Sequence, residues 1–224
     1  MSDVVIVDYG AGNLRSVTRA VAHAGVDAAV TTDWRAIEDA RALILPGVGA
    51  AADTMSNLRV RELVEPIRAY IASGRPFLGV CMGMQALFDL SEEGGSHECL
   101  GVLPGRIVRF PQGLTVPHMG WNTLQLRGAH PVFEGIEDGA YAYFVHSYYA
   151  VPEDPSVVVA ATEYDGVTFP AAVGRGNLLA TQFHPEKSGI DGLRLYANFL
   201  RLAQERGSIA PLATDAATTA ASGS

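Results

Sequence analysis

Short runs of consecutive apolar residues divide the N-terminal part of the chain, and each run leads into a turn that contains glycine. The runs lie at residues 4–7, 42–45 and 76–80. Continuous apolar runs of this length are typical of strands that are buried on both faces, as in a parallel sheet. We therefore expect a parallel sheet that is covered by helices on both of its faces.

The segments between these runs carry helical patterns. Apolar residues recur at helical spacing from Leu14 to Ala24, and Gly25 closes the segment. The alternation of strands and helices indicates an open, doubly wound, flavodoxin-like α/β sheet. The further expected elements are a strand at 26–30 followed by a turn, a helix at 51–73 that Pro66 kinks or divides, and a helix at 82–90.

After residue 95 the pattern changes to strands without long helices between them, so we expect antiparallel strands in the C-terminal half. The sequence predicts one domain over residues 1–207 and a disordered tail over residues 208–224, because the tail is rich in Ala, Thr and Ser. The expected strands are 100–110, 119–126, 141–151, 157–162, 168–173 and 178–183, with a hairpin turn at 174–177 and a last helix at 193–205.

Charge and composition narrow the functional classes. The net charge is −8 and no long run of Lys or Arg occurs, which argues against nucleic acid as a partner. The N-terminus has no signal-peptide pattern, and no apolar run approaches the roughly 20 residues that span a bilayer. Two cysteines do not form a secreted disulfide framework, so we expect a cytoplasmic location. No His/Cys cluster has the spacing of metal ligands, and we expect neither a metal nor another cofactor.

Cys81 lies at the centre of a Gly-x-Cys-x-Gly frame formed by residues 79–83. This frame is the thiol counterpart of the nucleophile elbow, in which a strand turns sharply into a helix. Glycines on both sides permit the close approach of neighbouring backbone, and the helix N-terminus favours a thiolate. The alternative for Cys81 is a buried structural cysteine. Cys99 has no such frame and is expected to be structural or incidental.

A thiol nucleophile requires a base, and His184 is the candidate among the six histidines. It ends an apolar strand and is followed by Pro185 and Glu186. Residues two apart in an extended segment share a face, so Glu186 can orient the imidazole of His184. Strand ends on one edge of an α/β sheet gather at one site, where Cys81 and His184 can meet. The alternative is that residues 184–186 are an ordinary strand exit.

Acyl chemistry at a thiol also requires N–H donors for an oxyanion. The backbone of Met82, directly after the cysteine, is one candidate donor. The loop of residues 46–49, Pro-Gly-Val-Gly, is another, because its glycines let backbone amides approach a ligand. The alternative for this loop is a simple turn.

These motifs, in this order, closely resemble those of the class I glutamine amidotransferases. The motifs are residues 46–49, residues 79–85 (GVCMGMQ) and residues 184–188 (HPEKS). Residues 8–14 (DYGAGNL), 117–122 (PHMGWN) and 143–149 (YFVHSYY) narrow the resemblance to the glutaminase subunits of imidazole glycerol phosphate synthases, which serve histidine biosynthesis. The resemblance spans about residues 3–206. Met82 stands where the family usually has Leu, a change that is close in volume.

The resemblance implies a Cys-His-Glu triad that hydrolyses L-glutamine to glutamate and ammonia. The thiolate of Cys81 would attack the side-chain amide carbon, His184 would move the proton, and Glu186 would orient His184. Water would then hydrolyse the glutamyl thioester. The residues that the resemblance places around glutamine are Gly47, Val48, Gly49, Met82, Gln85, Glu93, Ser147 and Tyr148.

The resemblance also implies a partner, a (β/α)₈-barrel cyclase subunit that receives the ammonia within a heterodimer and makes imidazole glycerol phosphate and AICAR. The residues that it places near this interface are Asn13, Trp121, Tyr143, His146 and Lys187. For Trp121 and Tyr143, packing in the core is the alternative. Other classes stay open from the residues alone: a glutaminase that feeds a different synthase, a cysteine peptidase on a similar scaffold, and a binding subunit without activity.

Overall fold

A central eight-stranded sheet organises the protein, which we describe from a computed structural model covering residues 3–205. The sheet order is β2-β1-β3-β4-β14-β13-β12-β9. The strands from β2 to β14 are parallel, and the last three pair antiparallel, which extends a doubly wound sheet as the sequence predicts. The strand bounds are β1 Val4–Val7, β2 Ala28–Thr31, β3 Ala42–Gly47, β4 Phe77–Cys81, β9 Gln125–Leu126, β12 Val158–Tyr164, β13 Val167–Arg175 and β14 Leu178–Thr181.

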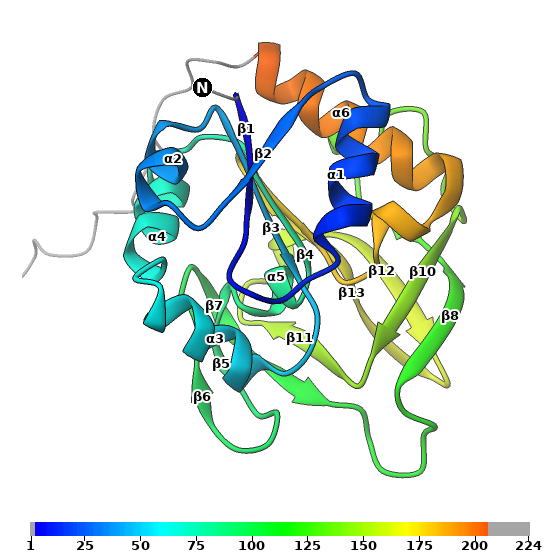
Figure 1. Cartoon of the computed structure of the whole chain (residues 1–224). Coiled ribbons are helices and arrows are strands. Elements are labelled where there is room, and N and C mark those ends of the chain that lie inside the picture. The colour runs from blue at the N-terminus through cyan, green and yellow to red at the C-terminus, as the bar shows by residue number, and fades with distance from the viewer. Residues whose placement is uncertain (1–2, 206–224) are drawn as a thin grey trace, which may run out of the picture.

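Two hydrophobic cores lie on the two faces of this sheet, and β1 contributes to both of them. Val4 and Ile6 pack into one core, whereas Val5 and Val7 pack into the other, as the alternation of side chains along a strand requires. Helices α1 and α6 cover the first face, and α2, α3 and α4 cover the second (Figure 1). The helix bounds are α1 Leu14–His23, α2 Trp34–Asp39, α3 Ala51–Val60, α4 Val64–Ala72, α5 Met82–Gln85 and α6 Gly189–Glu205.

Two smaller sheets flank the central one. The first has the order β11-β7-β5-β6, and the second is the antiparallel pair of β8 and β10, which lies on the opposite side of the molecule from α2 and α4 (Figure 1). The remaining bounds are β5 Phe88–Ser91, β6 His97–Glu98, β7 Leu103–Arg109, β8 His118–Thr123, β10 Tyr141–His146 and β11 Tyr148–Pro152, with one-turn 3₁₀ helices η1 Pro131–Phe133, η2 Pro155–Val157 and η3 Pro185–Lys187.

The helical segments differ from the sequence predictions in three internal places, and in addition the last helix begins at Gly189 instead of Leu193. The helix expected at 51–73 is divided, but not at Pro66: the chain breaks between α3 and α4, where Glu62 has a φ of +57°. Pro66 instead lies in the first turn of α4, where a missing N–H is tolerated. Residues 34–39 form α2 where only a turn is expected, and the Asp33 side chain accepts a hydrogen bond from Arg35 N at 3.0 Å. The third difference concerns α5, which ends at Gln85 instead of Leu90 because residues 88–91 join a sheet.

None of the helices between residues 3 and 205 combines the length and apolarity needed to cross a membrane. The prediction of one domain over 1–207 and a disordered tail over 208–224 stays a prediction, since residues 206–224 lie outside the described part of the chain.

Candidate active site

Cys81 is the last residue of β4, and the chain turns directly into α5 at Met82. The backbone of Cys81 has a φ of +54° and a ψ of −105°, a conformation that costs a residue with a side chain on the order of 1–3 kcal/mol. The flanking glycines are required by close backbone contacts. A Cβ on Gly83 would lie 1.9 Å from Leu45 O, and one on Gly79 would lie 2.7 Å from Gly83 O. The predicted elbow is therefore present, with a strained cysteine at its apex.

His184 follows β14, the parallel neighbour of β4, so both residues leave the sheet at its carboxyl edge. The Nδ1 atom of His184 lies 2.8 Å from Oε1 of Glu186, and the two side chains are only 2% and 1% exposed. A carboxylate can only accept, so Nδ1 carries the proton of this hydrogen bond. The other ring nitrogen, Nε2, is buried and makes no hydrogen bond of standard geometry with any described residue.

The electrostatic environment of His184 favours a charged imidazolium. Burial alone lowers the pKa of His184, but its interactions with Cys81 and with Glu186 outweigh burial and raise this pKa from 6.5 to about 10. The Cys81 sulfur thus interacts with the imidazole even though no standard hydrogen bond joins them. A sulfur beside an imidazolium is favoured as the thiolate, the attacking form. The helix that follows the sulfur is shorter than expected, since α5 is a single turn of four residues.

The loop after β3 lies beside the elbow. Gly47 pairs with Cys81 across β3 and β4, and a Cβ on Gly47 would come within 2.6 Å of the Met82 Cβ. Gly49 has a φ of +95° and Val48 is exposed. The structure therefore brings the predicted oxyanion loop and the Met82 backbone to the same edge as Cys81.

The other residues that the resemblance places around glutamine are distributed around this edge. The buried Gln85 donates from Nε2 to Tyr148 O at 2.9 Å, and its Oε1 has no partner among the described residues. The Glu93 carboxylate accepts a hydrogen bond from Ala51 N at 2.8 Å, so it also caps the start of α3. Ser147 and Tyr148 are half-buried at the junction of β10 and β11.

Of the five residues assigned to a partner interface, four are exposed or half-buried and one, His146, is buried. Trp121, Tyr143 and Lys187 lie together: the rings of Trp121 and Tyr143 are 6.1 Å apart, and Lys187 Nζ is 5.8 Å from the Tyr143 ring. Asn13 is the N-cap residue of α1 and is half-buried. His146 differs from all four, because its side chain is buried and does not reach the surface.

Sequence reasoning missed one residue at the site, Gln182. Its Nε2 atom lies 3.7 Å from Cys81 Sγ, and its Oε1 accepts a hydrogen bond from Gln85 Nε2 at 2.9 Å. The spacing that connects Glu186 to His184 also applies here. Gln182 precedes His184 by two residues, a spacing that in an extended segment places both side chains on one face. In the structure both residues follow the end of β14 at Thr181.

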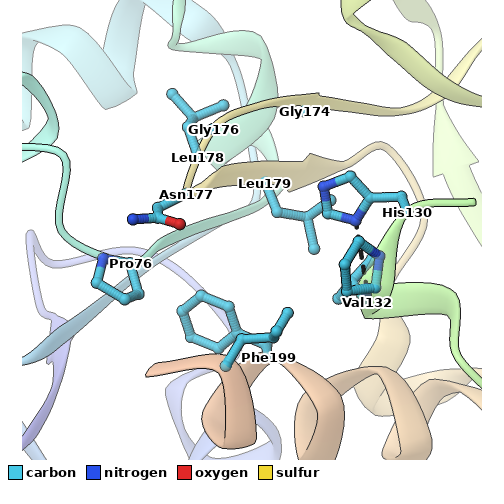
Figure 2. A pocket seen from close by; sticks show the side chains of 11 residues that line it. Pro76, His130, Val132, Gly174, Gly176, Asn177, Leu178, Leu179 and Phe199 are labelled. Atoms are coloured by element: carbon cyan, nitrogen blue, oxygen red, sulfur yellow. Dashed lines mark hydrogen bonds between the residues drawn. The ribbon is translucent and has the colours of Figure 1, made fainter. Parts of the chain in front are cut away.

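The pocket in Figure 2 is not part of this site. It is a cavity of about 200 Å³ lined by apolar side chains together with His130 and Asn177. Pro76 and Leu178, which also line it, lie at the amino ends of β4 and β14, the edge opposite to Cys81. Residues 3–205 contain no group of three or more His, Cys, Asp or Glu side chains that could hold a metal ion.

Two buried neutral histidines lie near the site, and because of them we expect the free energy of unfolding to decrease in acid. Burial lowers the pKa of His118, and lowers that of His146 to about 3 with added repulsion from His118 and His184. In the unfolded chain both titrate near 6.5, so between pH 6.5 and 3 the unfolded state binds more protons and the free energy of unfolding falls as pH falls. His146 alone predicts a loss of about 2 kcal/mol at pH 5.

Urea unfolding at pH 7 and pH 5 measures this loss, and His146→Leu serves as the control because it removes one of the two groups. Equal free energies of unfolding of the wild type at the two pH values would contradict the prediction. His184 acts in the other direction: its pKa is raised, so its stabilising contribution is complete below pH 6.5 and is lost progressively as the pH rises from 6.5 to about 10.

Comparisons with known proteins agree with this geometry. The model of the family described as "Glutamine amidotransferase class-I" matches residues 5–202. The imidazole glycerol phosphate synthase subunit HisH of Dehalococcoides mccartyi (strain CBDB1) is 52% identical over 200 residues, which cover 89% of this chain and 97% of the relative. The protein of the same name from Syntrophotalea carbinolica is 53% identical over 203 residues, 88% of this chain and 98% of that one.

Solved structures share the fold. A crystal structure of a glutamine amidotransferase superimposes with a TM-score of 0.69 at 24% identity, covering 89% of this chain and 98% of the other. The structure of PurLQS from Thermotoga maritima gives a TM-score of 0.69 at 21% identity, with 90% of this chain and 99% of the other covered.

Proposed function

We propose, from the premise that this chain belongs to the class-I glutamine amidotransferase family, that it is the glutaminase subunit of an imidazole glycerol phosphate synthase. The support is the identity of more than half of the aligned residues to two HisH subunits, over almost the whole length of those subunits. The function places the chain in histidine biosynthesis, where it supplies ammonia from L-glutamine to a cyclase subunit.

One observation carries the catalytic part of the proposal. A strained cysteine at the carboxyl edge of the sheet interacts with an imidazole that a buried carboxylate orients. Such a set activates a thiol for attack on an acyl carbon. A structural cysteine has no need of either the strained backbone or the ion pair. Cys81 is the nucleophile, His184 the general acid and base, and Glu186 the orienting acid.

The reaction proceeds in two halves. In the first, the Cys81 thiolate forms a bond to the amide carbon of glutamine, the C–N bond breaks, and the imidazolium of His184 gives its proton to the leaving nitrogen as ammonia departs. In the second, His184 takes a proton from water, the hydroxide attacks the thioester carbon, and the C–S bond breaks to release glutamate and the thiolate. Backbone N–H groups of Met82 and of the Gly47–Gly49 loop are the candidates to stabilise the negative oxygen in both halves.

The partner is proposed to be a (β/α)₈-barrel cyclase subunit that binds over β8, β10 and η3. The support is a group of exposed apolar side chains on or next to these elements: Met119 is 62% exposed, Trp121 56%, Tyr141 60% and Ile190 73%. Apolar side chains gathered on one face are typical of interaction sites. A closed interface keeps ammonia from being lost to water.

A reconstitution experiment tests the function. The chain is assayed for glutamate release with the cyclase subunit absent, present, and present with its nucleotide ligand. We expect slow hydrolysis by the chain alone and an acceleration of about tenfold or more with the liganded partner, because a conformational coupling between sites has that size. Full activity of the lone chain, or no response to the partner, would contradict the assignment to this synthase while leaving the glutaminase assignment intact.

A further inference from the structure

A continuous chain of hydrogen bonds runs from the β8–β10 pair to the nucleophile. Asn122 Nδ2 lies 3.4 Å from His118 Nε2, and His118 Nδ1 lies 3.1 Å from His146 Nε2. The two histidines are direct cross-strand partners on β8 and β10. His146 Nδ1 lies 2.8 Å from Tyr148 O, which also accepts from Gln85 Nε2 at 2.9 Å. From Gln85 the chain continues to Gln182 and then to Cys81 Sγ.

The direction of every bond in this chain is determined by atoms that cannot change roles. Tyr148 O is a backbone carbonyl and only accepts, so Gln85 must present its NH₂ group to it. The same NH₂ group faces Gln182, so Gln182 must present Oε1 to Gln85 and therefore Nε2 to the sulfur. A flipped Gln182 amide would place an oxygen against the thiolate and an NH₂ group against the NH₂ group of Gln85. The carbonyl thus sets the orientation of both amides.

The histidine pair binds the same carbonyl, and fixed donors and acceptors also determine which ring nitrogens carry protons. His146 donates from Nδ1 to Tyr148 O, and as a neutral ring it accepts at Nε2 from His118 Nδ1. His118 then accepts at Nε2 from Asn122, whose Nδ2 also donates to Glu163 O at 2.7 Å and whose Oδ1 accepts from Thr123 N at 2.8 Å. The lowered pKa values of both rings keep them neutral at physiological pH, which preserves this order.

Burial makes the chain rigid. Apart from Asn122 and Tyr148, its members are at most 7% exposed: Gln182 is fully buried, Gln85 is 3% exposed, and His118 and His146 are 4% and 6% exposed. A buried polar group that loses its partner pays its full desolvation cost, so each member holds the next in place. His118 is also stacked between the rings of Tyr164 and Phe144, at 4.2 and 5.1 Å.

We propose that Gln182 is a further catalytic residue, whose Nε2–H stabilises the Cys81 thiolate, and that the His118–His146 pair positions it through Tyr148 O and Gln85. This inference rests on the proposed glutaminase function for its catalytic meaning. The proposed interaction between Gln182 and the sulfur needs neither substrate nor partner, so it can be tested in the isolated chain. A hydrogen bond to a charged group is worth about tenfold to a hundredfold in an equilibrium, and it disappears when the donor is removed.

The test measures the alkylation of Cys81 by iodoacetamide as a function of pH in the isolated full chain, with the modified peptide identified by mass spectrometry. We expect Gln182→Met, which keeps the volume and removes the donor, to lower the rate at pH 7 by about tenfold or more and to move the midpoint of the pH profile upward. Gln182→Glu should move it further, because it places a negative charge beside the sulfur.

A matched pair of variants tests the positioning role. His146→Leu removes the donor to Tyr148 O, whereas His146→Asn keeps an NH₂ group close to the position of Nδ1. We expect the leucine variant to move the alkylation midpoint upward and the asparagine variant to restore most of the wild-type profile. A purely structural role would lower the thermal stability of the leucine variant without moving the midpoint.

The outcomes separate this inference from the proposed function. Unchanged alkylation profiles in folded Gln182→Met would overturn the inference, even if glutamine hydrolysis falls, since Gln182 would then act on substrate binding. If the profiles shift as expected but the wild-type chain releases no glutamate from glutamine, the thiolate network stands and the glutaminase assignment fails. If Gln182→Met does not fold, the Gln182→Glu profile and the His146 pair decide the question.

Discussion

Replacing Cys81 with alanine is expected to abolish glutamine-dependent synthesis by the reconstituted complex while leaving ammonia-dependent synthesis intact. In the proposed mechanism the sulfur forms the covalent bond to the amide carbon, and alanine has no group that could take its place. Loss of a catalytic nucleophile typically costs on the order of 10⁶ in kcat. Ammonia supplied from solution bypasses this step, so the cyclase reaction should continue at high ammonium concentration.

The second cysteine provides a matched control for this experiment. Cys99 is buried, and burial raises the pKa of its thiol to about 11, so it is an unreactive thiol at neutral pH. Cys99→Ala should retain glutamine-dependent turnover close to that of the wild type. The measurement is product formation with glutamine or with ammonium as the nitrogen source. Turnover with glutamine by the Cys81→Ala complex would show that the covalent mechanism is wrong.

Replacing Gly83 with alanine is expected to destabilise the protein by about 3 kcal/mol and to remove glutaminase activity at the same time. The added Cβ would lie 1.9 Å from Leu45 O. Because that atom belongs to the backbone of a fully buried central strand, the elbow itself has to move, and the sulfur moves with it. Neither partner in the clash is a flexible side chain that could turn away.

Gly174→Ala is the control for this prediction, because it makes the same chemical change in another strand. A Cβ there would meet only side-chain atoms of His130 and Val159, both at 3.2 Å, and these can shift by a few tenths of an ångström. The two variants are compared by urea unfolding and by glutamate release. If Gly83→Ala is as stable and as active as Gly174→Ala, the elbow does not depend on backbone contact at residue 83.

The central sheet and the sharp turn at Cys81 could be predicted because their signals are local. An apolar run such as residues 42–45 has no other low-energy place than a doubly covered strand, and the frame around Cys81 specifies its own turn. His184 and Glu186 are only two residues apart, so the sequence indicates that they are close; the structure joins them through the 3₁₀ turn η3 and not through the extended segment that the prediction assumes. Each of these signals lies within a few consecutive residues, so it does not depend on contacts with distant segments.

The features that could not be predicted depend on contacts between distant segments. Residues 82–90 have apolar spacing that suits a helix, but pairing of Phe88 with Leu103 on β7 overrides this preference after one turn. The His118–His146 pair depends on the register between β8 and β10, and the two histidines are 28 residues apart in the chain. No local pattern specifies that register, and the placement of His146 near a partner interface comes from the resemblance alone.

The backbone conformation of Cys81 has a consequence for how this protein changes over generations. Among the common amino acids, glycine adopts such dihedral angles with the least strain, so the fold taken by itself would favour a residue without any side chain at this position. A homologue that only binds a partner subunit, without catalysis, does not need the thiol. In such a protein we expect glycine to replace cysteine at the position of residue 81 before the surrounding strands change.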